Sequence, residues 1–177
     1  MHLRIYDPRI LAIDLRHRRF GYAVFEGHRM LLDWGVRVYP AVGDAEAEMA
    51  RKRLAALLIL FSPSAIVITK ERLDKTHINA HMRFLVEAVR REASAHAIPI
   101  YLLEQSQVKQ TFLNLDCNTK DEIASALARI FPKLHWNLPL QRKLGQSEHP
   151  RMTIFDAIAL GLAYWQQSGT RLPPPLE

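Results

Sequence analysis

Three acidic residues stand where a charged side chain is costly without a partner. Asp14 ends the apolar run ILAID, Glu71 comes shortly after the apolar run AIVIT, and Asp156 interrupts the apolar segment MTIFDAIALGLAYW. A carboxylate in such surroundings loses its hydration, so each acid is expected to pair with a cation, to face water or to hold a metal ion. Taken singly, Asp14 or Asp156 is explained by a turn cap or an arginine pair as well as by a metal site.

Taken together, the three acids predict a shared metal site. Carboxylate oxygens suit Mg²⁺ and Mn²⁺, which keep part of their water and bind phosphate. Two such ions about 4 Å apart can activate water and stabilise the leaving oxygen when a phosphodiester is hydrolysed. Asp14, Glu71 and Asp156 come from distant parts of the sequence. They are expected to converge at one edge of a mixed sheet against which a C-terminal helix packs.

Basic residues follow the first acid directly. Arg16, Arg18 and Arg19 occupy the turn after Asp14, where their guanidinium groups would flank a phosphate held near that acid. The alternative for these arginines is a solvated turn without a ligand.

A second basic segment, residues 132–150, reads PKLHWNLPLQRKLGQSEHP. A connection of this length is typical of a functional or a disordered segment. Its aromatic and basic side chains predict a platform for stacking and charge, formed by His135, Trp136, Arg142 and Lys143. For Trp136, packing back onto the core explains the residue equally well.

The hydrophobic pattern predicts the elements that must position these residues. Short apolar runs predict strands, and longer segments with apolar residues at helical spacing predict helices. The expected strands cover residues 10–14, 20–25, 30–39, 65–69 and 99–103. Helices are expected over residues 44–61, 79–97, 106–114 and 151–167, with one more that begins at Thr119 and has Glu122 completing a capping box. This order predicts an α/β domain with a five-stranded mixed sheet and helices on both faces.

Length and composition are those of one ordinary globular domain with a basic surface. The chain has 177 residues and a net charge of +6, which favours a polyanionic partner. We expect residues 1–168 to form the domain and residues 169–177 to form an extended, proline-rich tail. The single Cys117 excludes an internal disulfide framework. Without a signal-peptide pattern or an apolar run of membrane-spanning length, the chain is expected to be soluble and cytoplasmic, with no membrane partner.

Three segments resemble those of RuvC-type Holliday junction resolvases, which belong to the ribonuclease-H-like nucleases. ILAIDLRHRRFGYAVFEG resembles the family's opening hairpin, QVKQTFLNLDCNTKDEI a second block, and FDAIALGLAYW the final helix. They occur in the family's order across most of the chain. The resemblance implies a ribonuclease-H-like fold in which Asp14, Glu71 and Asp156 are the catalytic, metal-binding acids. It also implies that Lys109 and Lys120 are basic residues of the active site.

The chain departs from the family's pattern at three places. Leu15–Arg19 stands where the family has Pro and Gly after its first Asp. A gapless alignment puts Thr69 at the family's glutamate, so Glu71 takes that role only if the strand end shifts. Thr153 stands one turn before Asp156, where the family has another acid or a histidine. With three acids for two ions, one Mg²⁺ or Mn²⁺ is expected to bind well and the second weakly.

The leading hypothesis is a metal-dependent, structure-selective endonuclease that hydrolyses branched DNA in recombination and repair. Its expected nucleic-acid contacts are Arg16, Arg18, Arg19, Lys109, Lys120, Arg142 and Lys143. Because a four-way junction has two-fold symmetry, a homodimer is expected. The alternatives are a YqgF-like nuclease and a catalytically impaired RuvC-like protein that binds nucleic acid. An actin-like or sugar-kinase ATPase shares the strand order but needs a Gly-rich phosphate turn, which LRHRRF does not offer.

Overall fold

The computed structural model of the protein describes residues 7–39, 44–70, 80–140 and 147–169. Its strands form a five-stranded sheet in the order β3-β2-β1-β4-β5. Strand β2 is antiparallel to both β1 and β3, whereas β4 is parallel to both β1 and β5. The strands are β1 (Arg9–Arg16), β2 (Arg19–Glu26), β3 (Met30–Val38), β4 (Ala65–Thr69) and β5 (Ile100–Leu103). The expected five-stranded mixed sheet is therefore confirmed.

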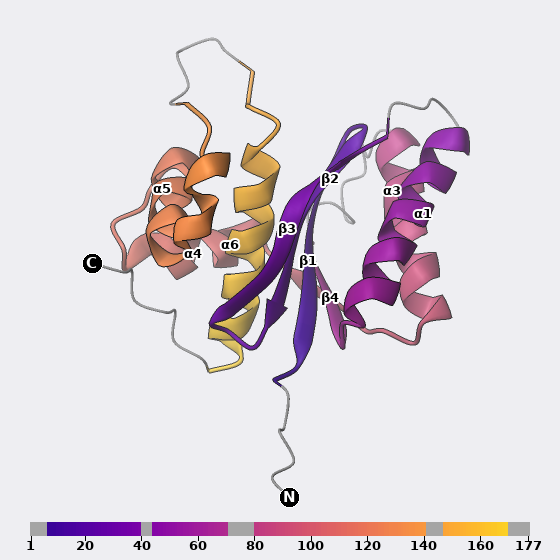
Figure 1. The fold of residues 1–177 in the computed structure, drawn as a ribbon, viewed down its shortest axis with the longest axis horizontal. Coiled ribbons are helices and arrows are strands. Elements are labelled where there is room, and N and C mark those ends of the chain that lie inside the picture. The colour runs from indigo at the N-terminus through magenta and orange to yellow at the C-terminus, as the bar shows by residue number, and fades with distance from the viewer. Residues whose placement is uncertain (1–6, 40–43, 71–79, 141–146, 170–177) are drawn as a thin grey trace, which may run out of the picture.

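Helices cover both faces of the sheet, as expected (Figure 1). Helices α1 (Asp44–Phe61) and α3 (Ala80–Ala95) lie on one face, and α4 (Gln105–Leu113), α5 (Lys120–Ile130) and α6 (Met152–Gln167) lie on the other. Each described element lies within two residues of its expected bounds. One difference is the 3₁₀ helix Pro132–Asn137, which occupies the start of a segment expected to be a connector without regular structure.

The alternation of side chains along β1 divides the apolar residues between two core clusters. Ile10 and Ala12 point towards α6, whereas Leu11, Ile13 and Leu15 point towards α1 and α3. Because side chains two residues apart share a face of a strand, Asp14 and Arg16 follow Ile10 and Ala12 onto the α6 face. Because β1 is buried on both faces, this alternation determines that Asp14 faces the core cluster that contains α6.

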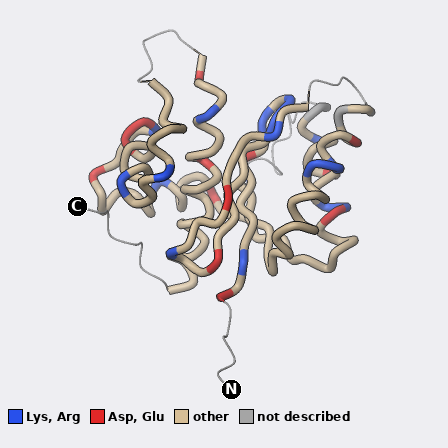
Figure 2. Tube along the Cα trace, viewed as in Figure 1, with Lys and Arg blue, Asp and Glu red and all other residues tan. Residues whose placement is uncertain are grey.

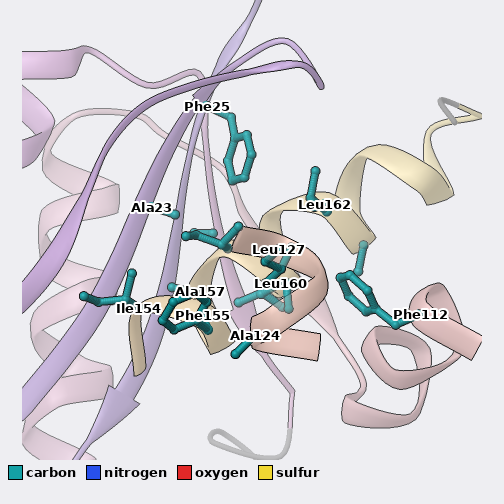
Figure 3. Close-up of a cluster of buried hydrophobic side chains, with 14 of the residues drawn as sticks. Ala23, Phe25, Phe112, Ala124, Leu127, Ile154, Phe155, Ala157, Leu160 and Leu162 are labelled. Atoms are coloured by element: carbon teal, nitrogen blue, oxygen red, sulfur yellow. The ribbon is translucent and has the colours of Figure 1, made fainter. Parts of the chain in front are cut away.

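Helix α6 is apolar on nearly every side because it lies between the sheet and the outer helices. It packs against β1 and β2 on one side and against α4 and α5 on the other. Figure 3 shows its side chains Ile154, Phe155 and Leu160 in the cluster with Ala23 and Phe25 of β2. A polar residue within this helix therefore needs a partner at the edge of the core.

The start of α5 agrees with the capping box expected from the sequence. The hydroxyl of Thr119 accepts a hydrogen bond from the backbone N–H of Glu122, and the Glu122 carboxylate accepts one from the backbone N–H of Thr119. This reciprocal pair satisfies two N–H groups and fixes the start of α5. It thereby positions Lys120, the first residue of the helix.

No helix in the described part of the chain has both the length and the apolar character needed to cross a membrane. The expected tail, residues 169–177, lies outside the described residues except for Gly169.

Gly21 allows α6 to lie directly on β2. A Cβ atom at residue 21 would stand 2.1 Å from the backbone oxygen of Thr153, which leaves no room for any side chain. Gly21 is also the cross-strand partner of Asp14. The contact therefore fixes the N-terminal part of α6 next to the strand position that carries the first acid.

We predict that Gly21→Ala lowers the free energy of unfolding by about 1–3 kcal/mol or more, because the added methyl group meets rigid backbone. Gly35→Ala is the matched control, since its Cβ would meet only the Tyr22 side chain, at 3.1 Å. Urea unfolding of both variants measures the difference. A Gly21→Ala protein at least as stable as Gly35→Ala would show that α6 does not depend on this contact.

Candidate active site

The end of β1 places an acid and a cation on the same face of the sheet. Asp14 and Arg16 are two residues apart on β1, and Asp14 is only 5% exposed. Arg16 Nε donates a hydrogen bond to Asp14 Oδ2 at 2.6 Å. The backbone oxygen of Arg16 accepts a hydrogen bond from the Tyr39 hydroxyl at 3.2 Å, which ties the strand end to the segment after β3.

Asp156 reaches the same guanidinium from α6. Arg16 Nη2 donates to Asp156 Oδ2 at 2.7 Å, so neighbouring nitrogens of one side chain hold both acids. This arrangement follows from the fold, because α6 lies on Gly21 and Gly21 pairs with Asp14. The expected convergence of Asp14 and Asp156 is present in the structure, with a cation of the protein between them.

Lys120 and Glu148 complete the cluster. Lys120 Nζ donates to Asp156 Oδ2 and to Glu148 Oε1, each at 2.8 Å. Glu148 belongs to the connecting segment that precedes α6 and was not among the expected site residues. We call Asp14, Arg16, Lys120, Glu148 and Asp156 the carboxylate–cation network.

Both cations of the network remain charged. Burial by itself lowers the pKa of Arg16, but the charge of Asp14 and the hydrogen bond to it, then Asp156 and Glu148, raise this pKa above its ordinary value. Burial also lowers the pKa of Lys120, and Asp156 and Glu148 raise it, against repulsion from Arg16, so that the net shift is again upward. The two positive charges are therefore present wherever the carboxylates are ionised.

The carboxylates are of the donor type that Mg²⁺ and Mn²⁺ prefer, but their arrangement does not fit the expected two-ion site. The Oδ2 atoms of Asp14 and Asp156 contact Arg16, and Glu148 Oε1 contacts Lys120. Within residues 7–39, 44–70, 80–140 and 147–169, no group of three or more Asp, Glu, His or Cys side chains is arranged to hold a metal ion. The carboxylates of Asp14, Asp156 and Glu148 instead contact positively charged side chains of the protein itself.

The third expected ligand, Glu71, lies outside the described residues. Thr69, the last residue of β4, extends the register in which Ile13 pairs with Ile68, and this brings Thr69 level with Asp14. Thr153 is 2% exposed, and its hydroxyl donates to the backbone oxygen of Pro150 at 2.8 Å. Thr69 is therefore level with Asp14, and Thr153 lies one helical turn before Asp156. At both of these positions the family resemblance implies a further metal ligand.

The expected nucleic-acid contacts fall into three groups. Arg16 and Lys120 belong to the network. Arg18 is exposed at the tip of the β1–β2 hairpin, Arg19 is half-buried at the start of β2, and Lys109 is exposed on α4. Figure 2 shows basic residues gathered at the hairpin tip. Arg142 and Lys143 lie outside the described residues.

Trp136 does not fold back onto the core. It lies in the 3₁₀ helix, is 89% exposed, and accepts a hydrogen bond on its backbone oxygen from Arg151 Nη1 at 3.3 Å. Lys133 and His135, in the same turn, are also exposed. The described part of the predicted stacking platform therefore faces solvent beside the start of α6.

Sequence reasoning missed Glu148 and the role of Gly21. A signal for Glu148 was its place in a basic segment that leads directly into the helix carrying Asp156. Gly21 lies within the segment that resembles the family's opening hairpin, but the close approach of α6 to it depends on a packing distance that no sequence pattern carries.

Neither a family model nor a curated protein matches the sequence. Among solved structures, RuvC of Thermus thermophilus, also solved in complex with a Holliday junction substrate, superposes with a TM-score of 0.67 and 20% identity. This match covers 93% of the present chain and 99% of RuvC. The yeast mitochondrial Holliday junction resolvase Ydc2 gives 0.61 and 16%, covering 92% and 81%. The resolvase of Fowlpox virus, bound to Holliday junction DNA, gives 0.51 and 11%, covering 92% and 99%. The chain therefore has the RuvC-like, ribonuclease-H-like fold.

We predict that Arg16→Met lowers the free energy of unfolding by about 3 kcal/mol, because it removes the cation shared by two carboxylates, one of them buried. Adding Asp14→Asn should recover part of this loss, since the two residues contact each other. Urea unfolding at neutral pH measures the set.

Arg91→Met is the matched control for this measurement. Arg91 is on α3, its side chain is 74% exposed, and it makes only a long pair with Glu87, at 3.9 Å. Its loss should change stability by about 0.5 kcal/mol or less. Equal losses for Arg16→Met and Arg91→Met would contradict a buried, stabilising bridge.

Proposed function

We propose that this chain is a resolvase-like protein that binds branched DNA. The observation that carries the proposal is the group of exposed basic residues near the Asp14–Asp156 pair, Arg18 at the hairpin tip and Arg151 at the start of α6, in a chain with the resolvase fold. The net charge of +6 favours association with a polyanion. The Thermus thermophilus and Fowlpox virus proteins of this fold have been solved with Holliday junction DNA.

Exposed cations would position the DNA through its phosphates. Arg18 at the hairpin tip and Arg151 at the start of α6 are both exposed, and Arg151 lies five residues before Asp156. Lys109 on α4 is exposed as well. Contacts of this kind orient a duplex without reading its sequence, which suits recognition of a branched shape.

Trp136 would meet an unpaired or unstacked base. An indole that is 89% exposed among Lys133, His135 and Arg151 combines a stacking surface with positive charge. Base–aromatic stacking contributes about 1–3 kcal/mol per base and tolerates any base. A branch point, where stacking between base pairs is interrupted, offers such a surface.

The two-fold symmetry of a four-way junction favours binding by two copies of the chain. The homodimer expected from the sequence therefore remains part of this proposal. The mass of the complex with a four-way junction, measured by light scattering, distinguishes one bound copy from two.

Metal-dependent endonuclease activity on the bound DNA is the second candidate function. The meeting of Asp14 and Asp156 from opposite ends of the chain favours it, because paired carboxylates are the donors that Mg²⁺ or Mn²⁺ would use in phosphodiester hydrolysis. The contacts of both acids with Arg16 speak against it. A YqgF-like nuclease would share the same acids, so the substrates tested should include RNA.

We predict that the chain binds a four-way junction more tightly than a linear duplex of equal length, in the presence of EDTA. Affinity should fall steeply as salt rises, because phosphate contacts release counterions. Arg18→Gly combined with Arg151→Ala should weaken binding and flatten the salt dependence, whereas Arg91→Ala on the opposite face should change neither. Fluorescence anisotropy measures the wild type and the two variants. Equal affinity for the junction and the linear duplex would refute the proposal.

Cleavage assays with the same junction decide between the two candidate functions. We predict that the wild-type protein leaves the junction intact in Mg²⁺ and in Mn²⁺, since Arg16 holds both acids. Cleavage that requires either metal and is abolished by Asp14→Asn would instead establish the endonuclease.

A further inference from the structure

We propose that Arg16 and Lys120 are the resident cations of the carboxylate site and take the place of divalent metal ions there. The inference deepens the proposed function, on which it rests for its biological meaning, because it states why the resolvase fold in this chain would bind DNA without metal.

The backbone position of Arg16 is set by the strand. Asp14 and Arg16 share a face of β1 by the two-residue alternation. Both ends of this pair are held in the sheet, since Asp14 pairs with Gly21 and Arg16 with Arg19. The Arg16 side chain therefore begins on the same strand face as the Asp14 carboxylate, and its guanidinium contacts that carboxylate.

The contacts of Arg16 occupy one carboxylate oxygen of each acid. Asp14 Oδ2 lies 2.6 Å from Nε and Asp156 Oδ2 lies 2.7 Å from Nη2. The planar guanidinium suits such a double contact, because its N–H groups form a rigid fork. An ion that bridged these two oxygens would have to displace a side chain that is only 22% exposed.

Lys120 adds a second cation from another element. Its ammonium group contacts Asp156 and Glu148 at 2.8 Å each. The capping box of Thr119 and Glu122 fixes the start of α5 and with it the place of Lys120. The backbone position of the second cation is therefore also set by the fold.

The charge balance works against a divalent ion. The carboxylates of Asp14, Glu148 and Asp156 carry three negative charges, and Arg16 and Lys120 supply two positive ones. A divalent ion entering the network would meet two like charges at close range, which weakens its attraction to the acids. Without Arg16 and Lys120 these carboxylates would repel one another, and a divalent ion would meet no competing cation of the network.

The test is a titration with Mn²⁺ alone, without DNA, followed by electron paramagnetic resonance of the free ion and by thermal unfolding. The wild-type protein should show no saturable Mn²⁺ site at sub-millimolar concentrations and no metal-dependent rise in Tm. Arg16→Ala combined with Lys120→Ala should bind Mn²⁺ at least about tenfold more tightly and gain Tm with added metal.

The matched control is Arg18→Gly combined with Arg151→Ala, which removes two positive charges from the same end of the molecule and leaves the network intact. Residue 18 has a φ of 57°, which glycine adopts readily. This control should bind Mn²⁺ as weakly as the wild type. An equal gain in the control, or a wild-type affinity equal to that of the network variant, would overturn the inference.

A milder variant keeps the test decisive if the double replacement prevents folding. Arg16→Gln retains a polar side chain but removes the charge between the acids, and it should also gain Mn²⁺ affinity over the wild type. No gain in a folded Arg16→Gln protein would refute the role of Arg16. Junction binding in EDTA is measured separately, so a protein that binds neither Mn²⁺ nor DNA would uphold the resident cations and refute the proposed function.

Discussion

Two negative charges at the edge of an apolar core share one guanidinium, and the arrangement of this end of the molecule depends on that sharing. Asp14 is nearly buried at the end of β1, and Asp156 interrupts a helix that is apolar on almost all sides. Removing a carboxylate from water is unfavourable unless an opposite charge and hydrogen bonds replace the lost hydration. Arg16 supplies the opposite charge and a hydrogen bond to each of the two acids. Lys120 connects Asp156 to Glu148, which lies in the segment before α6.

The same interaction connects the fold to its chemistry. Helix α6 can lie on β2 because Gly21 has no side chain, and this contact brings Asp156 beside Asp14. In the absence of a counterion, two carboxylates brought together in this way would repel each other. The approach that the glycine permits sterically is therefore stabilised electrostatically by the arginine. Close packing and charge neutralisation therefore act at the same place.

Most of the fold was predictable because its strands and helices follow from local patterns in the sequence. Apolar runs such as ILAID and AIVIT predict strands, and the strand order follows from short hairpins and helical crossovers. The capping box at Thr119 was readable from the spacing of two residues. The 3₁₀ helix Pro132–Asn137 was not predicted, since a single tight turn that begins with proline has no periodicity to detect. The exposure of Trp136 was left open by the sequence, because an indole suits both a core and a surface.

For the site, the sequence by itself determined that Asp14 and Asp156 need partners, because apolar neighbours surround both, and that arginines follow Asp14 closely. The sequence predicted that Arg16 lies in the turn after the strand, whereas β1 extends to Arg16, so the structure places Asp14 and Arg16 on one face of the strand. Only the tertiary structure decided that the partner of both acids is the same arginine, and that Lys120 and Glu148 join them. Those contacts unite residues up to 140 positions apart, and their geometry depends on how closely α6 approaches Gly21. Sequence patterns report local periodicity, whereas ion pairs over such separations depend on distances that are set when the helices pack against the sheet.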